Sequence, residues 1–291
     1  MPLLRYRLGG PVWSFRGWAG GLYSADARPA DFLRQYASVF NAVEGNTTFY
    51  SEPSAASVQR WRDDTPPSFR FCFKLPAAIT HERALVGAQT QVSAFLARMA
   101  PLGERLGPFM IQLPSGFGPR QLGDLRRFLT GLPRELRFAV ELRHPSFFGA
   151  TDAARDVRDL LGELGCDRVV LDTRGLRAGP QDHPAVREAR HAKPDLPVEP
   201  LATGPTPIVR FVAHPEGRWN EAPLEAWAAT LAAWIRAGRE PYLLVHCPDN
   251  ARVPALARRA HALLAKHAQV GELPDWPGER GEGARGQLRL L

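Results

Sequence analysis

The stretch Phe138-Ala-Val-Glu-Leu-Arg143 shows the pattern that decides the fold. Apolar and mixed side chains alternate along it, as they do in a β-strand with one greasy face. The segment Ala153–Leu164 then has helical spacing, and a second apolar run follows at Arg168–Asp172. A strand, a helix and a strand in this order are typical of a β/α unit with parallel strands.

The same alternation runs through most of the chain. Strands are expected at Trp13–Trp18, Asn41–Asn46, Phe69–Lys74, Phe109–Leu113, Phe138–Arg143, Arg168–Asp172, Ile208–Val212 and Tyr242–His246. Helices are expected at Pro29–Phe40, Ser54–Arg62, Gln89–Leu102, Arg120–Leu129, Ala153–Leu164, Pro223–Ala237 and Pro254–Lys266. This rhythm predicts an α/β fold with a single TIM (β/α)8-type barrel. A doubly wound sheet is the alternative, but the glycine-rich run at 17–21 lacks the GxGxxG spacing of its phosphate loop.

One interval departs from the rhythm. Residues 173–207 are rich in Pro and Gly, which predicts an irregular loop in place of a regular helix after the sixth expected strand. One helical turn is expected there, near Ala185–His191, but no regular helix of three or more turns. Residues 1–270, with this long loop, are expected to form one barrel domain. The Gly- and Arg-rich segment 271–291 is expected to be a flexible tail.

The composition is that of a globular protein with a basic balance. The 291 residues are 44% hydrophobic and 23% charged, with a net charge of +7, and Arg strongly outnumbers Lys. A positive balance favours anionic partners such as phosphorylated metabolites or nucleic acid. The three cysteines are far apart, which argues against a zinc ribbon or a disulfide framework. Neither a signal peptide nor a membrane-spanning apolar run is recognisable, so we expect a cytoplasmic protein with no membrane partner.

Polar side chains stand at or near the carboxyl end of nearly every expected strand. They are Glu44, Asn46, Lys74, Gln112, Glu141, Arg143, Asp172, Arg210 and His246. In a barrel these ends meet at one mouth, where barrel enzymes assemble their active sites. We therefore predict that these residues converge in a polar site. The alternative is an ion-pair network that only closes the core.

The residue types at this mouth suggest acid/base chemistry. The candidate proton-moving groups are Glu44, Glu141 and Asp172, because burial and a neighbouring like charge raise the pKa of a carboxyl group. Charged and amide side chains would hold an anion and orient hydroxyls, and aromatic side chains would stack on a sugar or base. The candidate substrate-binding residues are Asn46, Tyr50, Lys74, His81, Gln112, Arg143, His144, Arg210 and His246, with Trp18 and Trp219 as further stacking candidates.

No cofactor is predicted, and a divalent metal is the alternative. Four histidines follow or end separate strands and, with the three carboxylates, would supply a mixed ligand set. They are His81, His144, His214 and His246. No HxH or HExxH spacing is present, so the metal-free interpretation is favoured.

A series of motifs between Trp13 and Thr173 is more specific. They are Gly17-Trp18, Val43-Glu-Gly-Asn-Thr-Thr-Phe-Tyr50, Phe71-Cys-Phe-Lys-Leu-Pro76, Thr80-His81, Gln112-Leu-Pro114, Ala139-Val-Glu-Leu-Arg-His-Pro-Ser146 and Leu171-Asp-Thr173. Together they resemble the YecE-like family, known as domain of unknown function 72. The resemblance implies a TIM barrel with a loose kinship to sugar-isomerase-like barrels, and no established reaction. The last third departs from the family pattern, with Arg210-Phe-Val-Ala-His214 in place of Arg-x-His-Gly, which suggests a divergent branch.

Three functions remain open at this point. The leading hypothesis is an enzyme that performs isomerase-like or hydrolytic acid/base chemistry on a sugar-containing, anionic small molecule. The second is a nucleic-acid-binding or phosphodiester-cleaving barrel, and the third is a non-catalytic ligand-binding barrel.

Overall fold

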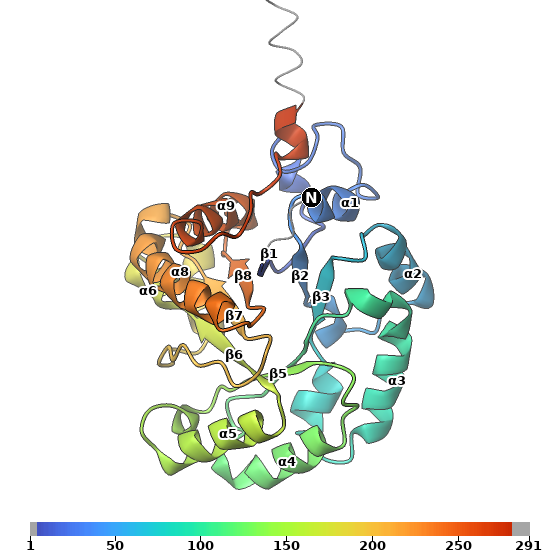
Figure 1. Cartoon of the computed structure of the whole chain (residues 1–291), viewed down its shortest axis with the longest axis vertical. Coiled ribbons are helices and arrows are strands. Elements are labelled where there is room, and N and C mark those ends of the chain that lie inside the picture. The colour runs from blue at the N-terminus through green and yellow to red at the C-terminus, as the bar shows by residue number, and fades with distance from the viewer. Residues whose placement is uncertain (1–4, 281–291) are drawn as a thin grey trace, which may run out of the picture.

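A computed structural model describes residues 5–280, and a ring of short strands stands at its centre (Figure 1). The strands are β1 (Arg7–Gly9), β2 (Ala42–Gly45), β3 (Arg70–Phe73), β4 (Phe109–Gln112), β5 (Phe138–Glu141), β6 (Asp167–Asp172), β7 (Ile208–Val212) and β8 (Tyr242–His246). Every strand pair with a recorded register is parallel. A parallel sheet needs crossover segments between its strands, which agrees with the alternation seen in the sequence.

Helices surround the strands (Figure 1). They are α1 (Phe32–Ala37), α2 (Ala55–Asp63), α3 (Gln89–Met99), α4 (Leu122–Thr130), α5 (Asp152–Glu163), α6 (Arg174–Ala178), α7 (Pro184–Ala192), α8 (Glu221–Arg236) and α9 (Val253–Leu264). In the part of the chain that the structure describes, none of them is both long enough and apolar enough to cross a membrane.

Backbone hydrogen bonds connect neighbouring strands around the ring. One sheet has the order β1-β8-β7-β6-β5-β4, and β2 pairs with β3 in a second. At one seam between the two sheets, the Glu44 N–H donates to the Gly10 carbonyl at 3.0 Å. At the other, the Leu75 N–H donates to the Met110 carbonyl at 3.0 Å, beside a bridge between Lys74 and Met110. The strands thus follow one another in a TIM-barrel-like arrangement, as the sequence predicts.

Two apolar layers cover the two faces of these strands. The inner layer consists of Ala42, Cys72, Met110, Ala139, Val169, Ile208, Tyr242 and Leu244, which are buried together. Their chain neighbours, such as Val43, Phe71 and Val140, belong to the larger core between the strands and the helices. Alternation along each strand therefore decides which side chains face the barrel interior.

The first strand was predicted at the wrong place. The structure has β1 at Arg7–Gly9, while 13–18 is a loop that ends in a 3-10 turn at Arg16–Trp18. Its aromatic residues signal burial without a strand: Trp13 packs edge-on against Trp61, with ring centroids 5.5 Å apart. The observed strand is short and begins with a charged residue, Arg7, so the sequence shows no apolar run there. The Arg7 side chain pairs with Glu240 at 2.5 Å.

The interval 173–207 contains more helix than expected. Besides α6, it holds α7, whose nine residues make about two and a half turns where one turn was predicted. The prolines bracket this helix: Pro184 occupies its first turn, and Pro194 follows its end. The His183 ring caps α7 by accepting a hydrogen bond from the Ala185 N–H at 3.1 Å. The rest of the interval, up to β7, contains no helix or strand.

The described part of the expected tail packs against the barrel. Arg258 in α9 forms two hydrogen bonds of 2.8 Å with the Glu279 carboxylate. The same guanidinium lies over the Trp276 ring, 3.5 Å from its centroid. Residues 271–280 are thus held in place, and the remainder of the expected tail, 281–291, lies outside the described residues.

A substitution at the seam between β1 and β2 tests this closure. A Cβ added to Gly9 would lie 1.9 Å from the Ala42 carbonyl oxygen, so the backbone of one strand would have to move. We expect Gly9→Ala to lower the free energy of unfolding by about 1–3 kcal/mol, a typical cost of overpacking. Urea denaturation of the two proteins measures the difference.

The control for this experiment is Gly162→Ala in α5. A Cβ there meets no atom within 4 Å, so the substitution should leave stability unchanged or raise it by about 1 kcal/mol through helix propensity. Equal unfolding midpoints for Gly9→Ala and the wild type would contradict the close approach of the two strands.

Candidate functional site

A ring of polar side chains lies directly above the inner apolar layer, toward the carboxyl ends of the strands. Residues two positions apart on a strand share a face, so the ring is found by adding two to the members of that layer. The resulting positions are Glu44, Lys74, Gln112, Glu141, Leu171, Arg210 and His246. Leucine occurs only on β6, and the other six strands each place a charged or hydrogen-bonding group in the barrel mouth.

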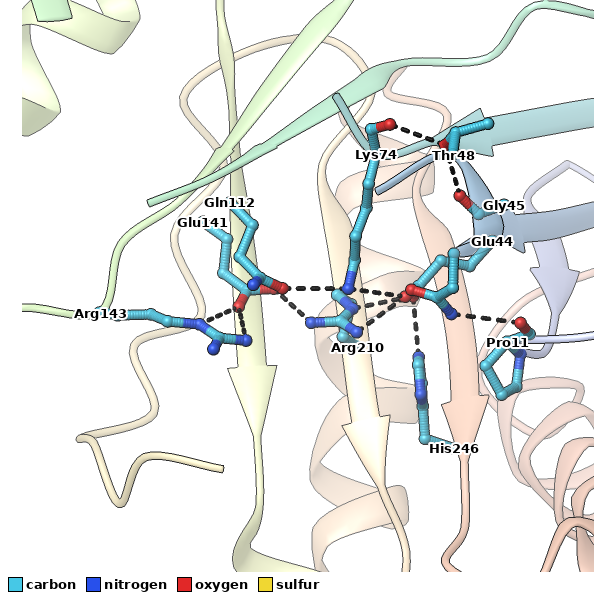
Figure 2. Close-up of polar contacts among 11 residues, drawn as sticks. Pro11, Glu44, Gly45, Thr48, Lys74, Gln112, Glu141, Arg143, Arg210 and His246 are labelled. Atoms are coloured by element: carbon cyan, nitrogen blue, oxygen red, sulfur yellow. Dashed lines mark hydrogen bonds and ion pairs between the residues drawn. The ribbon is translucent and has the colours of Figure 1, made fainter. Parts of the chain in front are cut away.

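Arg210 stands at the centre of this ring and bridges its two carboxylates (Figure 2). Its Nε and Nη2 donate to the two oxygens of Glu44 at 2.8 and 2.7 Å, in a bidentate pair. Its Nη1 donates to Glu141 Oε2 at 2.5 Å. Both carboxylates and the guanidinium are almost fully buried, so each charge depends on the others for neutralisation.

Three further side chains extend this bridge into a network. Arg143 donates from Nε to Glu141 Oε1 at 2.7 Å. Lys74 Nζ donates to Gln112 Oε1 at 3.0 Å and lies 3.5 Å from Glu44 Oε1. This Lys74–Glu44 contact and the Arg210 pairs join the ends of β2, β3, β5 and β7 in one network. We call this network the mouth cluster, and its members are Glu44, Lys74, Gln112, Glu141, Arg143 and Arg210.

The charges of the mouth cluster do not balance. Three cationic side chains, Lys74, Arg143 and Arg210, face two carboxylates. Burial alone would raise the pKa of Glu44 and Glu141, but Arg210 and the other cations outweigh it and hold both pKa values well below the ordinary carboxyl value. Both groups are therefore ionised at neutral pH, and one positive charge is left over.

Two members of the ring are less basic than usual. Burial lowers the pKa of His246 to about 4, although the neighbouring Glu44 opposes that shift. Its Nε2 lies 2.8 Å from Glu44 Oε2 and carries the proton, because an ionised carboxylate can only accept. Burial also lowers the pKa of Lys74 to about 8, and the charge of Arg210 acts in the same direction.

Asp172 does not join the mouth cluster, contrary to the sequence prediction. It ends β6 on the same side of the barrel, but its carboxylate faces the outer helices. It accepts from Trp227 Nε1 in α8 at 2.6 Å and from Arg174 Nη2 at 2.8 Å. The reason is alternation: Val169 faces the interior, so Leu171 does as well and Asp172 cannot. Its role in this structure is to tie β6 to α8.

Three other expected site residues make their hydrogen bonds and ring contacts outside the mouth cluster. His144 accepts from the Ser146 N–H at 3.2 Å and so begins the turn after β5. Trp18 is buried in the loop after β1 and donates to the Asn250 carbonyl at 2.8 Å. The Tyr50 ring is 84% exposed and meets Phe49 edge-on. Tyr50 remains accessible to a ligand, whereas Trp18 serves packing.

Asn46 and His81 lie at the edge of the mouth. The Asn46 side chain donates to the Pro11 carbonyl at 3.2 Å, which joins the segments after β1 and β2. His81 sits in a π-helical turn, Ala78–Glu82, and meets Phe49 edge-on. Burial lowers the pKa of His81, and so do the charges of Arg143 and Lys74. His81 is therefore a neutral imidazole beside a cationic site.

The histidines and carboxylates considered as possible metal ligands do not gather into one ligand set in the described part of the chain. Within residues 5–280, no three His, Cys, Asp or Glu side chains gather in a way that could hold a metal ion. His214, one of the expected ligands, accepts from the Glu216 N–H at 3.1 Å instead. The carboxylates of the mouth cluster are occupied by arginine and lysine.

One residue near the mouth was missed by the sequence analysis. Lys193 follows α7, and it lines a pocket of about 370 Å³ together with His246. The pocket lies between α7 and the segments that follow β1 and β8. Lys193 is far from any expected strand end, so the rule that located the other residues could not find it.

Comparison with known proteins assigns the chain to a family. The family model described as protein of unknown function DUF72 matches residues 7–280. The UPF0759 protein YecE of Escherichia coli K12 is 39% identical over 272 residues, covering 93% of this chain and 97% of that protein. Its counterpart in Escherichia coli O157:H7 is 38% identical over the same length.

Solved structures agree on the fold. A DUF72 family protein from Thermotoga maritima has a TM-score of 0.68 at 24% identity, covering 89% of this chain and 99% of its own. A DUF72 family protein from Enterococcus faecalis has a TM-score of 0.67 at 21% identity, with 91% and 99% covered. With a family model that spans the described barrel and relatives of such identity, the chain belongs to the DUF72 family.

Proposed function

We propose that this DUF72 protein is an enzyme that performs acid/base chemistry, isomerase-like or hydrolytic, on a sugar-containing, anionic small molecule. The observation that carries the proposal is the excess positive charge of the mouth cluster. Buried cations that outnumber the carboxylates they share are costly unless an anionic ligand neutralises the surplus charge. The carboxyl end of a barrel is also where characterised barrel enzymes place their chemistry.

Arg143 is the side chain best placed to hold the anion. It retains 18% exposure and pairs with Glu141 through one carboxylate oxygen, while Arg210 holds the other. The remaining donors of its guanidinium suit a phosphate or carboxylate group. Gln112 and Asn46 would then orient hydroxyl groups of the same ligand.

The proton-transferring group in this proposal is Lys74 rather than a carboxylate. Glu44 and Glu141 have lowered pKa values, which makes them weak bases at neutral pH, and their oxygens are occupied by cations. A general acid or base works best when its pKa is near the working pH, and the pKa of Lys74, about 8, fulfils this condition. Glu44 and Glu141 then act by fixing Arg210, Lys74 and Arg143 in place.

A pair of arginine variants separates binding from stability. Arg143→Ala leaves Glu141 paired with Arg210, so it should lower the free energy of unfolding by about 1.5 kcal/mol, as for the loss of one hydrogen bond to a charged group. Arg210→Met strands two buried carboxylates and should cost about 3–5 kcal/mol. Urea denaturation checks both values, and a large loss in Arg143→Ala would favour a purely structural network.

The same Arg143→Ala protein tests the binding role. In a thermal-shift screen, a sugar phosphate that raises the melting temperature of the wild type should not raise that of Arg143→Ala. The matched control is Arg126→Ala, which removes an exposed pair with Glu163 on the outer surface. An equal shift in all three proteins would exclude Arg143 from the site.

The pH dependence of turnover tests Lys74. Once a substrate is found, kcat should show an apparent pKa near 8, the value for Lys74. It should fall as the pH rises through this value if the protonated amine is the general acid, and rise if the free amine is the general base. Lys74→Arg keeps the positive charge but cannot release a proton near neutral pH, so it should lose about 100-fold or more in kcat and lose that ionisation. Full activity of Lys74→Arg would show that the proton is moved by another group, with His81, Glu44 and Glu141 as the remaining candidates.

A further inference from the structure

Lysine is rare in this chain, and its few positions are informative. Of the 37 Lys and Arg residues, only Lys74, Lys193 and Lys266 are lysines. Lys74 belongs to the mouth cluster and Lys193 lies beside it, whereas Lys266 is exposed after α9. Arginine thus serves almost every surface and pairing role in this protein. Two of the three lysine amines lie in or beside the barrel mouth. A lysine amine is a compact, strongly hydrated point charge, whereas a guanidinium is planar and delocalised.

The segment between β6 and β7 places Lys193 over the barrel mouth. Val186 of α7 and Leu176 of α6 pack on Leu171 and Val212, the last inward-facing apolar residues of β6 and β7. Helix α7 therefore lies against the ends of these strands. The residue that precedes a proline is driven to an extended conformation, and Lys193, with φ −113° and ψ 133°, leaves the helix in this way before Pro194.

Arginines fix the backbone on either side of Lys193. Arg177 Nη2 donates to the Lys193 carbonyl at 2.8 Å, and Arg190 Nε donates to the Leu176 carbonyl at 3.0 Å. Arg177 also forms an ion pair with Asp195 at 3.2 Å. Asp195 is the acidic residue nearest in sequence to Lys193, and its carboxylate is thus paired with Arg177. The position of the amine is thus built into the fold of the α6–α7 segment.

No carboxylate of the described residues pairs with the Lys193 amine. Among residues 5–280, its Nζ forms no ion pair and no hydrogen bond, although the side chain is half-buried. Glu188 lines the same pocket from α7 but is exposed and lies outside ion-pair distance. Burial lowers the pKa of Lys193, and the charge of Arg210 contributes in the same direction. A cation without an ion-pair partner among the described residues therefore lies next to a cluster that already carries excess positive charge.

We propose that Lys193 is an anion-binding residue, which holds a phosphate or carboxylate group of the ligand in the pocket between α7 and His246. This inference rests on the proposed function, because it assigns a second cationic contact to the same ligand. Pocket residues such as Pro11, Val12 and Ala189 would contact the uncharged part of that ligand. The volume of about 370 Å³ leaves room for a small molecule that carries such a group.

The small number of lysines permits a direct test with inorganic phosphate as the probe. Reductive methylation with 13C-formaldehyde gives each amine a separate NMR signal and keeps its charge, so the chain yields three lysine signals and one from the N-terminus. Phosphate should shift the Lys193 signal in a saturable way and leave the Lys266 signal in place. Similar shifts at both lysines would indicate general screening and would overturn the proposal.

Calorimetry on unmethylated variants provides the second measurement. Lys193→Met should weaken phosphate binding at least about tenfold, the loss of one charge-assisted hydrogen bond, while Lys266→Met should bind like the wild type. If Lys193→Met binds normally and Arg143→Ala does not, Lys193 has no binding role but the proposed anion site stands. If the wild type shows no saturable phosphate binding, both the Lys193 site and the charge argument for the proposed function are wrong.

Discussion

The bridge from Arg210 to Glu44 and Glu141 is the interaction on which the rest of the structure depends. It joins residues that are 166 and 69 positions apart in the sequence, within a fully buried site. Three charges can remain in such a site only if their geometry satisfies all of them at once. The strands β2, β5 and β7 must therefore have the correct register, since a slip of one residue would turn a charge toward the outer helices.

This constraint also determines the electrostatics of the mouth. The two carboxylates are held ionised and are no longer available as bases of ordinary strength. Their fixed negative charge in turn keeps Lys74 and Arg143 near the barrel axis in spite of Arg210. Lys74 is nevertheless less basic than an exposed lysine, because it is buried and Arg210 repels its charge. The site thus contains fixed charge together with one amine that titrates close to neutral pH.

The segment after β6 shows how an interval with little periodicity contributes to such a site. Its prolines limit α7 to nine residues. Its arginines donate hydrogen bonds to backbone carbonyls at the ends of α6 and α7, which holds the two short helices together. The outcome is a short helix held across the strand ends, with Lys193 at its exit. Long loops at the carboxyl end of a barrel are where barrel proteins differ from one another in function.

The sequence by itself determined the strand rhythm and the chemistry at the strand ends. Seven of the eight predicted strands overlap observed ones. The reason is that side chains alternate between the two faces of a strand, so apolar residues on one face recur with a period of two in the sequence. The same period would have assigned Leu171, rather than Asp172, to the interior, had Val169 been recognised as an inner residue. Position at the end of a strand was the wrong criterion there. The segment 13–18 was misleading because its aromatic side chains pack on the core without forming a strand.

Tertiary structure alone decided which charges meet. Whether Arg210 pairs with Glu44 or with Glu141 depends on the order of strands around the ring, and local periodicity contains no information on that order. It also decided the place of Lys193, which reaches the mouth through contacts of α6 and α7 with β6 and β7. The physical reason is the same in both cases. Alternation along a strand is a local property of the chain, whereas the pairing of buried charges depends on contacts between segments that only folding brings together.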